Sequence, residues 1–132
     1  MKKLLLIFFL TTTNLSANSI NFTNSSLLAD KIVHISSSSI LADMTVHFSS
    51  SSVFADTTFY VNKGFCGYAD KTIHITNSSL LADKIVHISS SAINVDKIVH
   101  ISNSPVFADK ELCIPDDISV ENAVAAAAVL EL

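Results

Sequence analysis

An aspartate that returns every 13 residues constrains this chain more than any other feature of its sequence. Seven aspartates are spaced by 13 residues at every step but one, where the step is 14. They are Asp30, Asp43, Asp56, Asp70, Asp83, Asp96 and Asp109. Four places after each aspartate comes a second column: His34, His47, Tyr60, His74, His87, His100 and Cys113. A fixed period of this kind indicates tandem repeats, in which each unit is stable only against its neighbours.

The segment after each aspartate alternates between apolar and polar residues, as in Val33, His34 and Ile35. A period of two in β-branched residues is typical of a strand. A helix fits poorly, because 13 residues at about 100° each would turn successive units about 220° apart. The serine runs that follow, such as residues 36–39, predict turns. After each turn we expect a second short extended piece, with these residues apolar and buried: Leu27, Ile40, Val53, Leu80, Ile93 and Val106.

One unit cannot be stable alone. Burying four side chains contributes about 6 to 10 kcal/mol, whereas ordering one unit costs on the order of 13 to 26 kcal/mol in backbone entropy. Stacking of units must supply the difference, through hydrogen bonds between them and a shared core. We therefore expect an all-β fold, a small β-solenoid of about six to seven 13-residue coils with a short C-terminal α-helix. Antiparallel hairpins or a meander are the alternative.

The two ends of the chain differ from the repeats. Residues 1–17 have the order of a signal peptide: two lysines, a short apolar run and Ala17 at the cut. The run is too short for a transmembrane helix, so we expect export to the periplasm, the outer surface or the medium. Residues 18–114 form the predicted repeat domain. Residues 115–132 are alanine-rich and predict a helical segment that caps the last coil.

The unit of residues 57–70 carries the extra residue and both glycines of the chain. It predicts either a bulged corner or a projecting loop that binds a partner. Export would permit a disulfide between Cys66 and Cys113. In the stacked-coil register, however, the two cysteines lie three coils apart and on different sides. That register therefore predicts two separate thiols.

The repeat unit A-D-x-x-[VI]-[HY]-[VIF], as in ADKTIHI at residues 69–75, resembles a bacterial family of short 13-residue-repeat proteins of unknown function. The longer central unit around Phe59, Tyr60 and Val61 fits the same resemblance, which covers residues 20–114. The resemblance supports a repeat architecture. It implies no activity.

In a parallel stack the second column becomes a ladder on one outer face: His34, His47, Tyr60, His74, His87 and His100. Imidazoles one coil apart could share Zn²⁺ or Cu²⁺, which prefer nitrogen ligands. A dedicated zinc site needs three or four ligands in a tetrahedral arrangement, and a flat ladder presents them in a line. The alternative is therefore a solvated stack without metal, and no cofactor is expected.

The aspartate column predicts the corner of each coil, where the carboxylate accepts backbone N–H groups of a turn. Calcium is the alternative, although the glycine-rich repeat of calcium-binding β-rolls is missing. An ice-binding face would need a regular threonine row, which Ile85 and Ile98 interrupt. A Ser/His/Asp set can be drawn on every coil, and such repetition indicates structure rather than catalysis.

These observations predict a non-enzymatic exported scaffold, or a surface protein that binds an unknown protein or surface partner along its regular face. The open strands at the ends of a solenoid would permit end-to-end self-association. All eight basic residues are lysine, so the bidentate arginine contacts typical of nucleic-acid recognition are absent and nucleic acid is not an expected partner. The alternative function is a metal-binding periplasmic or extracellular protein that uses the histidine ladder.

Overall fold

The computed structural model describes residues 19–64, 67 and 69–131. The predicted signal peptide, residues 1–17, lies outside this part. The described chain forms eight strands and one C-terminal helix. The strands are β1 (Ser19–Phe22), β2 (Lys31–Ser36), β3 (Met44–Phe48), β4 (Thr57–Lys63), β5 (Lys71–Thr76), β6 (Lys84–Ser89), β7 (Lys97–Ser102) and β8 (Lys110–Ile114). The helix is α2 (Val120–Val129).

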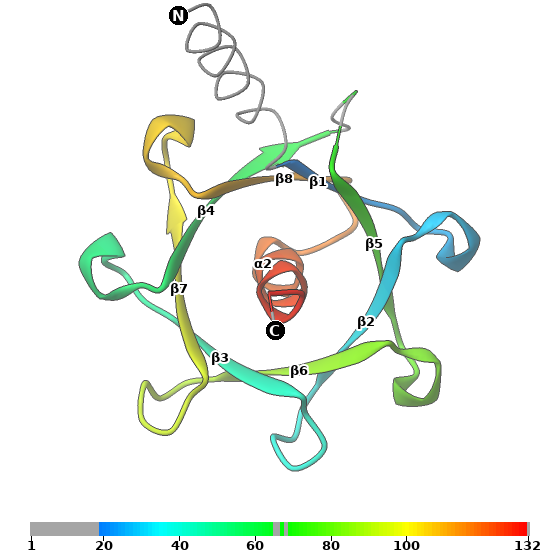
Figure 1. Cartoon of the computed structure of the whole chain (residues 1–132), viewed down its shortest axis with the longest axis horizontal. Helices are drawn as coiled ribbons and strands as arrows, with labels where there is room; N and C mark the ends of the chain where they lie inside the picture. The colour runs from blue at the N-terminus through cyan, green and yellow to red at the C-terminus, as the bar shows by residue number, and fades with distance from the viewer. Residues whose placement is uncertain (1–18, 65–66, 68, 132) are drawn as a thin grey trace, which may run out of the picture.

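The eight strands close into an all-parallel barrel in the order β1-β5-β2-β6-β3-β7-β4-β8. The chain winds around the axis twice, and the strands of the second turn lie between those of the first (Figure 1). The prediction of a β-solenoid was therefore wrong, although the β-rich character was right. Successive repeats are not neighbours, because a strand of the other turn lies between them. The closed wall also leaves no open end strand, so the basis for end-to-end growth by strand pairing is lost.

The register explains how a barrel of eight short strands can enclose a helix. Val33 pairs with Lys84 on one side of β2, and Lys31 pairs with Ile73 on the other, a shift of two residues from the repeat frame at both boundaries of this strand. The boundary between β1 and β8 has no such shift, since Asn21 pairs with Cys113. A two-residue shift keeps every side chain on its own face of the sheet. When the paired residues are followed once around the barrel, the path returns to β1 about 14 positions away from the residue where it started. This displacement is the shear of the barrel, and it is about 8 in a TIM barrel. The strands therefore tilt more strongly, and the wall lies about 10 Å from the axis.

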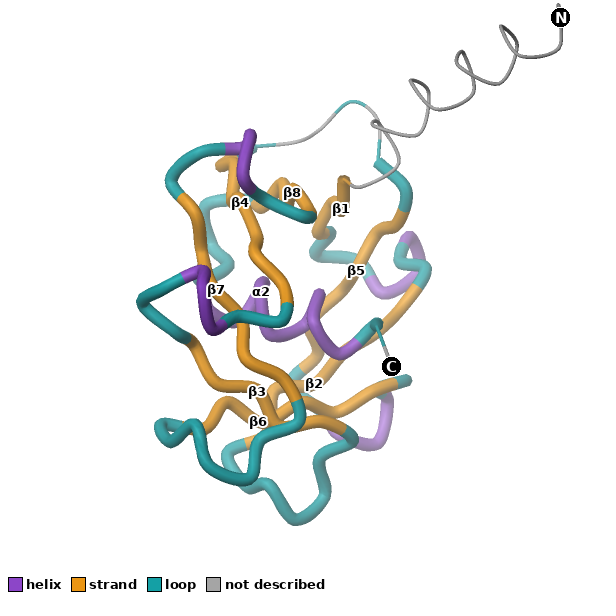
Figure 2. Tube along the Cα trace, turned by 60° about the vertical axis from the view of Figure 1, so that its left-hand side comes forward, coloured by secondary structure: helices purple, strands orange, loops and turns teal. Residues whose placement is uncertain are grey.

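Helix α2 occupies the interior of this wide barrel and packs against β2 to β8 (Figures 1 and 2). The prediction of a C-terminal helix is confirmed, but its role as a cap on the last coil was wrong. Residues 123–129 are buried on all sides and consist of alanine and valine alone. Small side chains are needed here, because the wall residues reach the helix from every direction. Ser119 caps the N-terminus by accepting the N–H of Asn122 at 3.1 Å.

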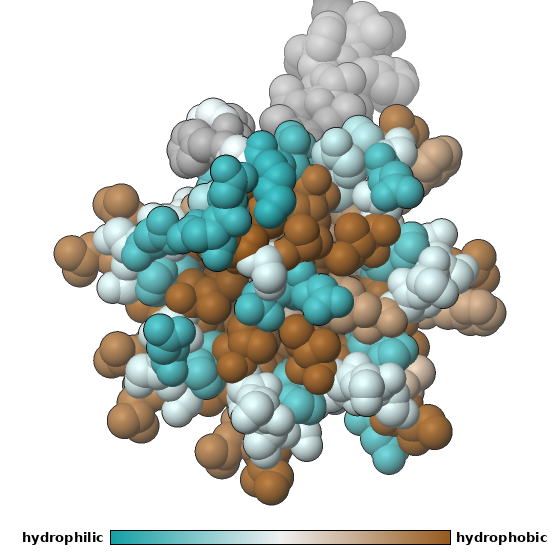
Figure 3. All heavy atoms as spheres, turned by 180° about the vertical axis from the view of Figure 1, so that it is seen from behind, coloured by the Kyte–Doolittle hydropathy of each residue, from teal (hydrophilic) through white to brown (hydrophobic). Residues whose placement is uncertain are grey.

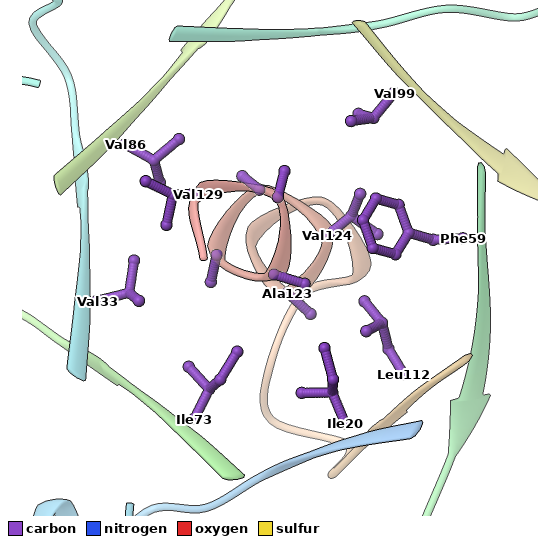
Figure 4. Close-up of a cluster of buried hydrophobic side chains, with 14 of the residues drawn as sticks. Ile20, Val33, Phe59, Ile73, Val86, Val99, Leu112, Ala123, Val124 and Val129 are labelled. Atoms are coloured by element: carbon purple, nitrogen blue, oxygen red, sulfur yellow. The ribbon is translucent and has the colours of Figure 1, made fainter. Parts of the chain in front are cut away.

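One apolar residue from each full repeat points inwards and is fully buried against the helix (Figure 4). The set is Val33, Val46, Phe59, Ile73, Val86, Val99 and Leu112. Ile20 and Phe22 of β1 complete the ring. At the rim where the strands begin, Glu131 at the end of α2 forms ion pairs with Lys97 and Lys110. The core is therefore a layer of wall side chains around a slender apolar helix.

The second apolar piece of each repeat is not a buried strand, which corrects our prediction for Leu27, Ile40, Val53, Leu80, Ile93 and Val106. In four loops it is a single 3₁₀ turn: Ser26–Leu28, Ser52–Phe54, Ser79–Leu81 and Pro105–Phe107. All six residues are exposed.

Gly64, in the longer unit, has a φ of 123°, a conformation that favours glycine, and follows the last residue of β4.

Candidate functional site

The histidine column lies on the outer face of the barrel wall, alternating with the buried inward column. Each Nδ1 lies 2.8–3.0 Å from a backbone carbonyl oxygen just beyond the neighbouring strand or at its end. The pairs are His34 to Thr76, His47 to Ser89, His74 to Thr23, His87 to Ser36, and His100 to Ser49. A carbonyl oxygen only accepts, so Nδ1 carries the proton and donates. Each histidine therefore fastens one strand to the next.

The spatial order of this column differs from the ladder predicted from sequence. Around the barrel the order is His74, His34, His87, His47, His100 and Tyr60, because the two turns of the chain alternate. Neighbouring histidines are also not level, since His87 pairs with Ser36 rather than with His34. All five imidazoles are half-buried. The predicted stack of sequence neighbours, His34 beside His47 and His74 beside His87, is thus replaced by a staggered belt.

Metal binding by this belt would have to use Nε2, because Nδ1 is occupied by a carbonyl. An Nδ1–H to carbonyl hydrogen bond is the usual support for a histidine that ligates metal through Nε2. In the described part of the chain, however, no three His, Cys, Asp or Glu side chains are grouped so that they could hold an ion. Within the described residues the belt therefore provides no tetrahedral ligand set.

The aspartate column clamps the end of each loop to the strand that the loop crosses. The carboxylate of Asp96 accepts the N–H of Thr45 at 2.8 Å, and the N–H of Asp96 donates to the Thr45 carbonyl at 2.9 Å. The same two-way contact joins Asp30 to Thr72, Asp43 to Ile85, Asp56 to Ile98, Asp83 to Ile32, and Asp109 to Thr58. Asp70 donates its N–H to Ser19. The contacts reach to another turn of the chain, whereas the sequence suggested a corner within one unit.

The serines give the loops a regular internal structure. In the loop after β3, Ser51 N donates to Ser49 Oγ at 3.1 Å, Ser49 Oγ donates to the Ser51 carbonyl at 2.9 Å, and Val53 N donates to Ser51 Oγ at 3.2 Å. The loops after β2, β6 and β7 repeat this pattern. Together with the histidine and aspartate contacts at its two ends, this network holds each loop in a defined shape.

These loops carry large apolar side chains at their tips, and sequence reasoning missed their exposure. Eleven such residues are between 68% and 94% exposed. They are Leu27, Leu28, Ile40, Leu41, Val53, Phe54, Leu80, Leu81, Ile93, Val106 and Phe107. The space-filling view shows hydrophobic side chains projecting at the outer margin of the molecule (Figure 3). We call these residues the apolar tips.

A shallow hollow lies at the rim where the strands end, beside the start of α2. Its lining includes His74, Asn77, Asp117, Ser119 and Asn122. His74 is bonded through Nδ1 to Thr23, and Ser119 accepts the N–H of Asn122. Two of its polar groups thus already serve the fold. The hollow offers less to a ligand than the tips do.

Cys113 in β8 is disulfide-bonded, which corrects the expectation of two separate thiols. The chain has one other cysteine, Cys66, which falls outside the described residues. Strand β4, which precedes Cys66 in the sequence, pairs with β8, and Asn62 lies opposite Cys113. The interleaved order of strands therefore removes the separation of three coils on which the expectation rested.

Comparison with protein family models, curated proteins and solved structures finds no match for this chain. The resemblance to the 13-residue-repeat family therefore stays a prediction. Within the described residues, no helix has the length and apolar character needed to cross a membrane.

Proposed function

We propose that this protein is an exported, non-enzymatic scaffold or binding protein whose contact surface is the set of apolar tips. The carrying observation is their exposure, up to 94% at Leu80. Exposed apolar patches on a folded protein are characteristic of interaction sites, and five of the six described loops expose two large apolar side chains next to each other. The same position is apolar in six repeats, so the exposure is a property of the unit rather than of one loop.

The loops are suited to binding because they are already ordered. Serine hydrogen bonds shape the loops, and aspartate and histidine contacts fix their ends. A surface that is rigid before it meets a partner loses less conformational entropy on binding. This rigidity supports a scaffold that displays fixed contact points.

Export is supported by the order of residues 1–17 and by the disulfide at Cys113, since oxidising compartments permit disulfides. The intact mass of the protein secreted by an expression host tests it. Cleavage near Ala17 is the expected result. A secreted product that still carries residues 1–17, or complete retention inside the cell, would contradict export.

Retention on an octyl-substituted resin tests the contact surface. The protein is loaded at high ammonium sulfate, which strengthens apolar contacts, and is eluted as the salt concentration falls. The tip variant Ile40→Ser, Val53→Ser, Ile93→Ser should elute at a clearly higher ammonium sulfate concentration than the wild type, because it has fewer exposed apolar side chains. The matched control Ser37→Ala, Ser50→Ala, Ser90→Ala changes three exposed residues in the same loops and should elute like the wild type. Equal retention of the tip variant and the wild type would refute the tips as the contact surface.

A metal-binding function of the histidine belt is the second candidate, favoured by the Nδ1–H contacts that leave Nε2 for a ligand. Melting is followed with and without Zn²⁺, Cu²⁺ and Ni²⁺, since an ion that binds the folded state must raise the Tm. The paired variant His74→Ala, His87→Ala should abolish any such rise. No shift with any of the three ions would end this candidate.

A further inference from the structure

We infer that the partner of the apolar tips is a second copy of this chain, so that molecules associate edge to edge in extended layers. This inference rests on the proposed function and names the partner for the same surface. It differs from end-to-end growth, because the contacts are made by loops at the circumference and not by strand edges.

The direction of the tips is the first argument. The six described loops radiate from the wall on different sides of the barrel (Figure 1). One globular partner or one flat membrane surface meets a single side and leaves the remaining tips in water. Several neighbours arranged around the molecule can cover them all. A second copy brings identical tips with it, because the repeat puts leucine, isoleucine or valine at the same position of each loop.

The distribution of charge is the second argument. All six described loops lack charged residues, in residues 23–29, 36–42, 49–55, 76–82, 89–95 and 102–108. The aspartates and lysines of the repeats collect where the strands begin, as at Asp83 and Lys84. Two copies can therefore meet tip to tip without repulsion between like charges. A membrane fits less well, because these loops have no lysine, arginine, tryptophan or tyrosine to contact lipid headgroups.

The size of one contact is the third argument. If two loops meet and each contributes two apolar tips, with about 100 Å² covered on each side chain, the contact buries on the order of 400 Å² in total. A stable interface needs about 1,200 to 2,000 Å². A single contact between two loops is therefore too weak to hold a discrete dimer. Several weak contacts acting together give avidity, and contacts on many sides give open-ended assembly.

Sedimentation velocity of the chain recovered after export, over about 1 μM to 1 mM, tests the inference. The wild type should pass continuously from monomer to large species, and sodium sulfate should shift the transition to lower concentration. The three-loop tip variant should require a more than about tenfold higher concentration. A variant with serine at Leu27, Ile40, Val53, Leu80, Ile93 and Val106 should remain monomeric, and the Ser→Ala control should behave like the wild type.

The outcomes separate this inference from the proposed function. A wild type that stays monomeric throughout overturns self-association even if no variant folds, and so does association that all variants share equally. A monomeric wild type that floats with phosphatidylcholine vesicles, while the tip variant does not, replaces the second copy by lipid and leaves the proposed contact surface standing. The proposed contact surface itself fails when the octyl resin retains the wild type and the tip variant equally, and that result does not depend on whether copies associate.

Discussion

Large apolar side chains recur with the same period on the strands and in the loops of this molecule, but those on the strands are buried and those in the loops are exposed. Val86 and its equivalents on the strands are fully buried against α2, whereas Leu80 and its equivalents in the loops project into solvent. Both columns are branched or aromatic apolar residues. The difference comes from what faces them: the inward column meets an alanine-rich helix, and nothing in the described chain covers the tips. Apolar character alone therefore does not identify the core of a repeat protein.

Removing one large side chain from the buried column and one from the apolar tips should give the largest difference in the free energy of unfolding. Phe59→Ala should lower the free energy of unfolding by about 3 to 5 kcal/mol, because it leaves a cavity beside α2. Phe54→Ala removes the same atoms from an exposed tip five residues earlier and should change stability by less than about 0.5 kcal/mol. Urea unfolding of both variants gives the comparison. Similar losses would show that the tip is packed or that the wall is not.

Overfilling the interior should give the next largest effect. Ala126→Leu adds a branched side chain to a helix that the wall surrounds, and overpacking of this kind costs about 1 to 3 kcal/mol. Ala92→Leu makes the same change in the exposed loop after β6 and should be nearly neutral. Thermal melts followed by circular dichroism measure both. A neutral Ala126→Leu would mean that the helix does not fill the barrel as described.

The sequence was sufficient to predict the repeat, the strand after each aspartate and the C-terminal helix. The inward position of Val33 and the outward position of His34 follow from their alternation along one strand. Which unit lies beside which does not follow, because a 13-residue period is the same for stacked and for interleaved units. The register of Val33 with Lys84 depends on closure around α2, which is a property of the whole chain.

The aspartate column was predictable in its residues but not in its partners, and the apolar tips were not predicted as a site at all. Asp96 was expected to bond a backbone amide, and it does, but the amide belongs to Thr45 in another turn of the chain. The exposure of Leu80 could have been suspected from its place directly after a serine run, where short polar residues favour a turn. Its apolar character pointed instead to burial, since leucine is usually inside.

The aspartate clamps should have a smaller effect than either core change. Asp96→Ala removes the acceptor of the Thr45 N–H and should cost about 0.5 to 1.5 kcal/mol. Asp96→Asn keeps a side-chain oxygen and should recover most of the loss. Asp116→Ala, at an exposed carboxylate outside the repeats, serves as the control. If Asp96→Asn is as destabilising as Asp96→Ala while Asp116→Ala is neutral, the clamp depends on charge rather than on the hydrogen bond.

The smallest effect is expected for Leu80→Ser, and its dependence on concentration makes it informative. In a dilute monomer the side chain is 94% exposed, so the Tm should stay within about 2 °C of the wild type. If copies associate through the tips, the Tm of the wild type should rise with protein concentration, because association stabilises only the folded state. The rise should be smaller in Leu80→Ser and unchanged in Ser90→Ala. A Tm that falls in Leu80→Ser even at the lowest concentration would instead show that the tip packs within its own molecule, and the contrast between the two apolar columns would lose its basis.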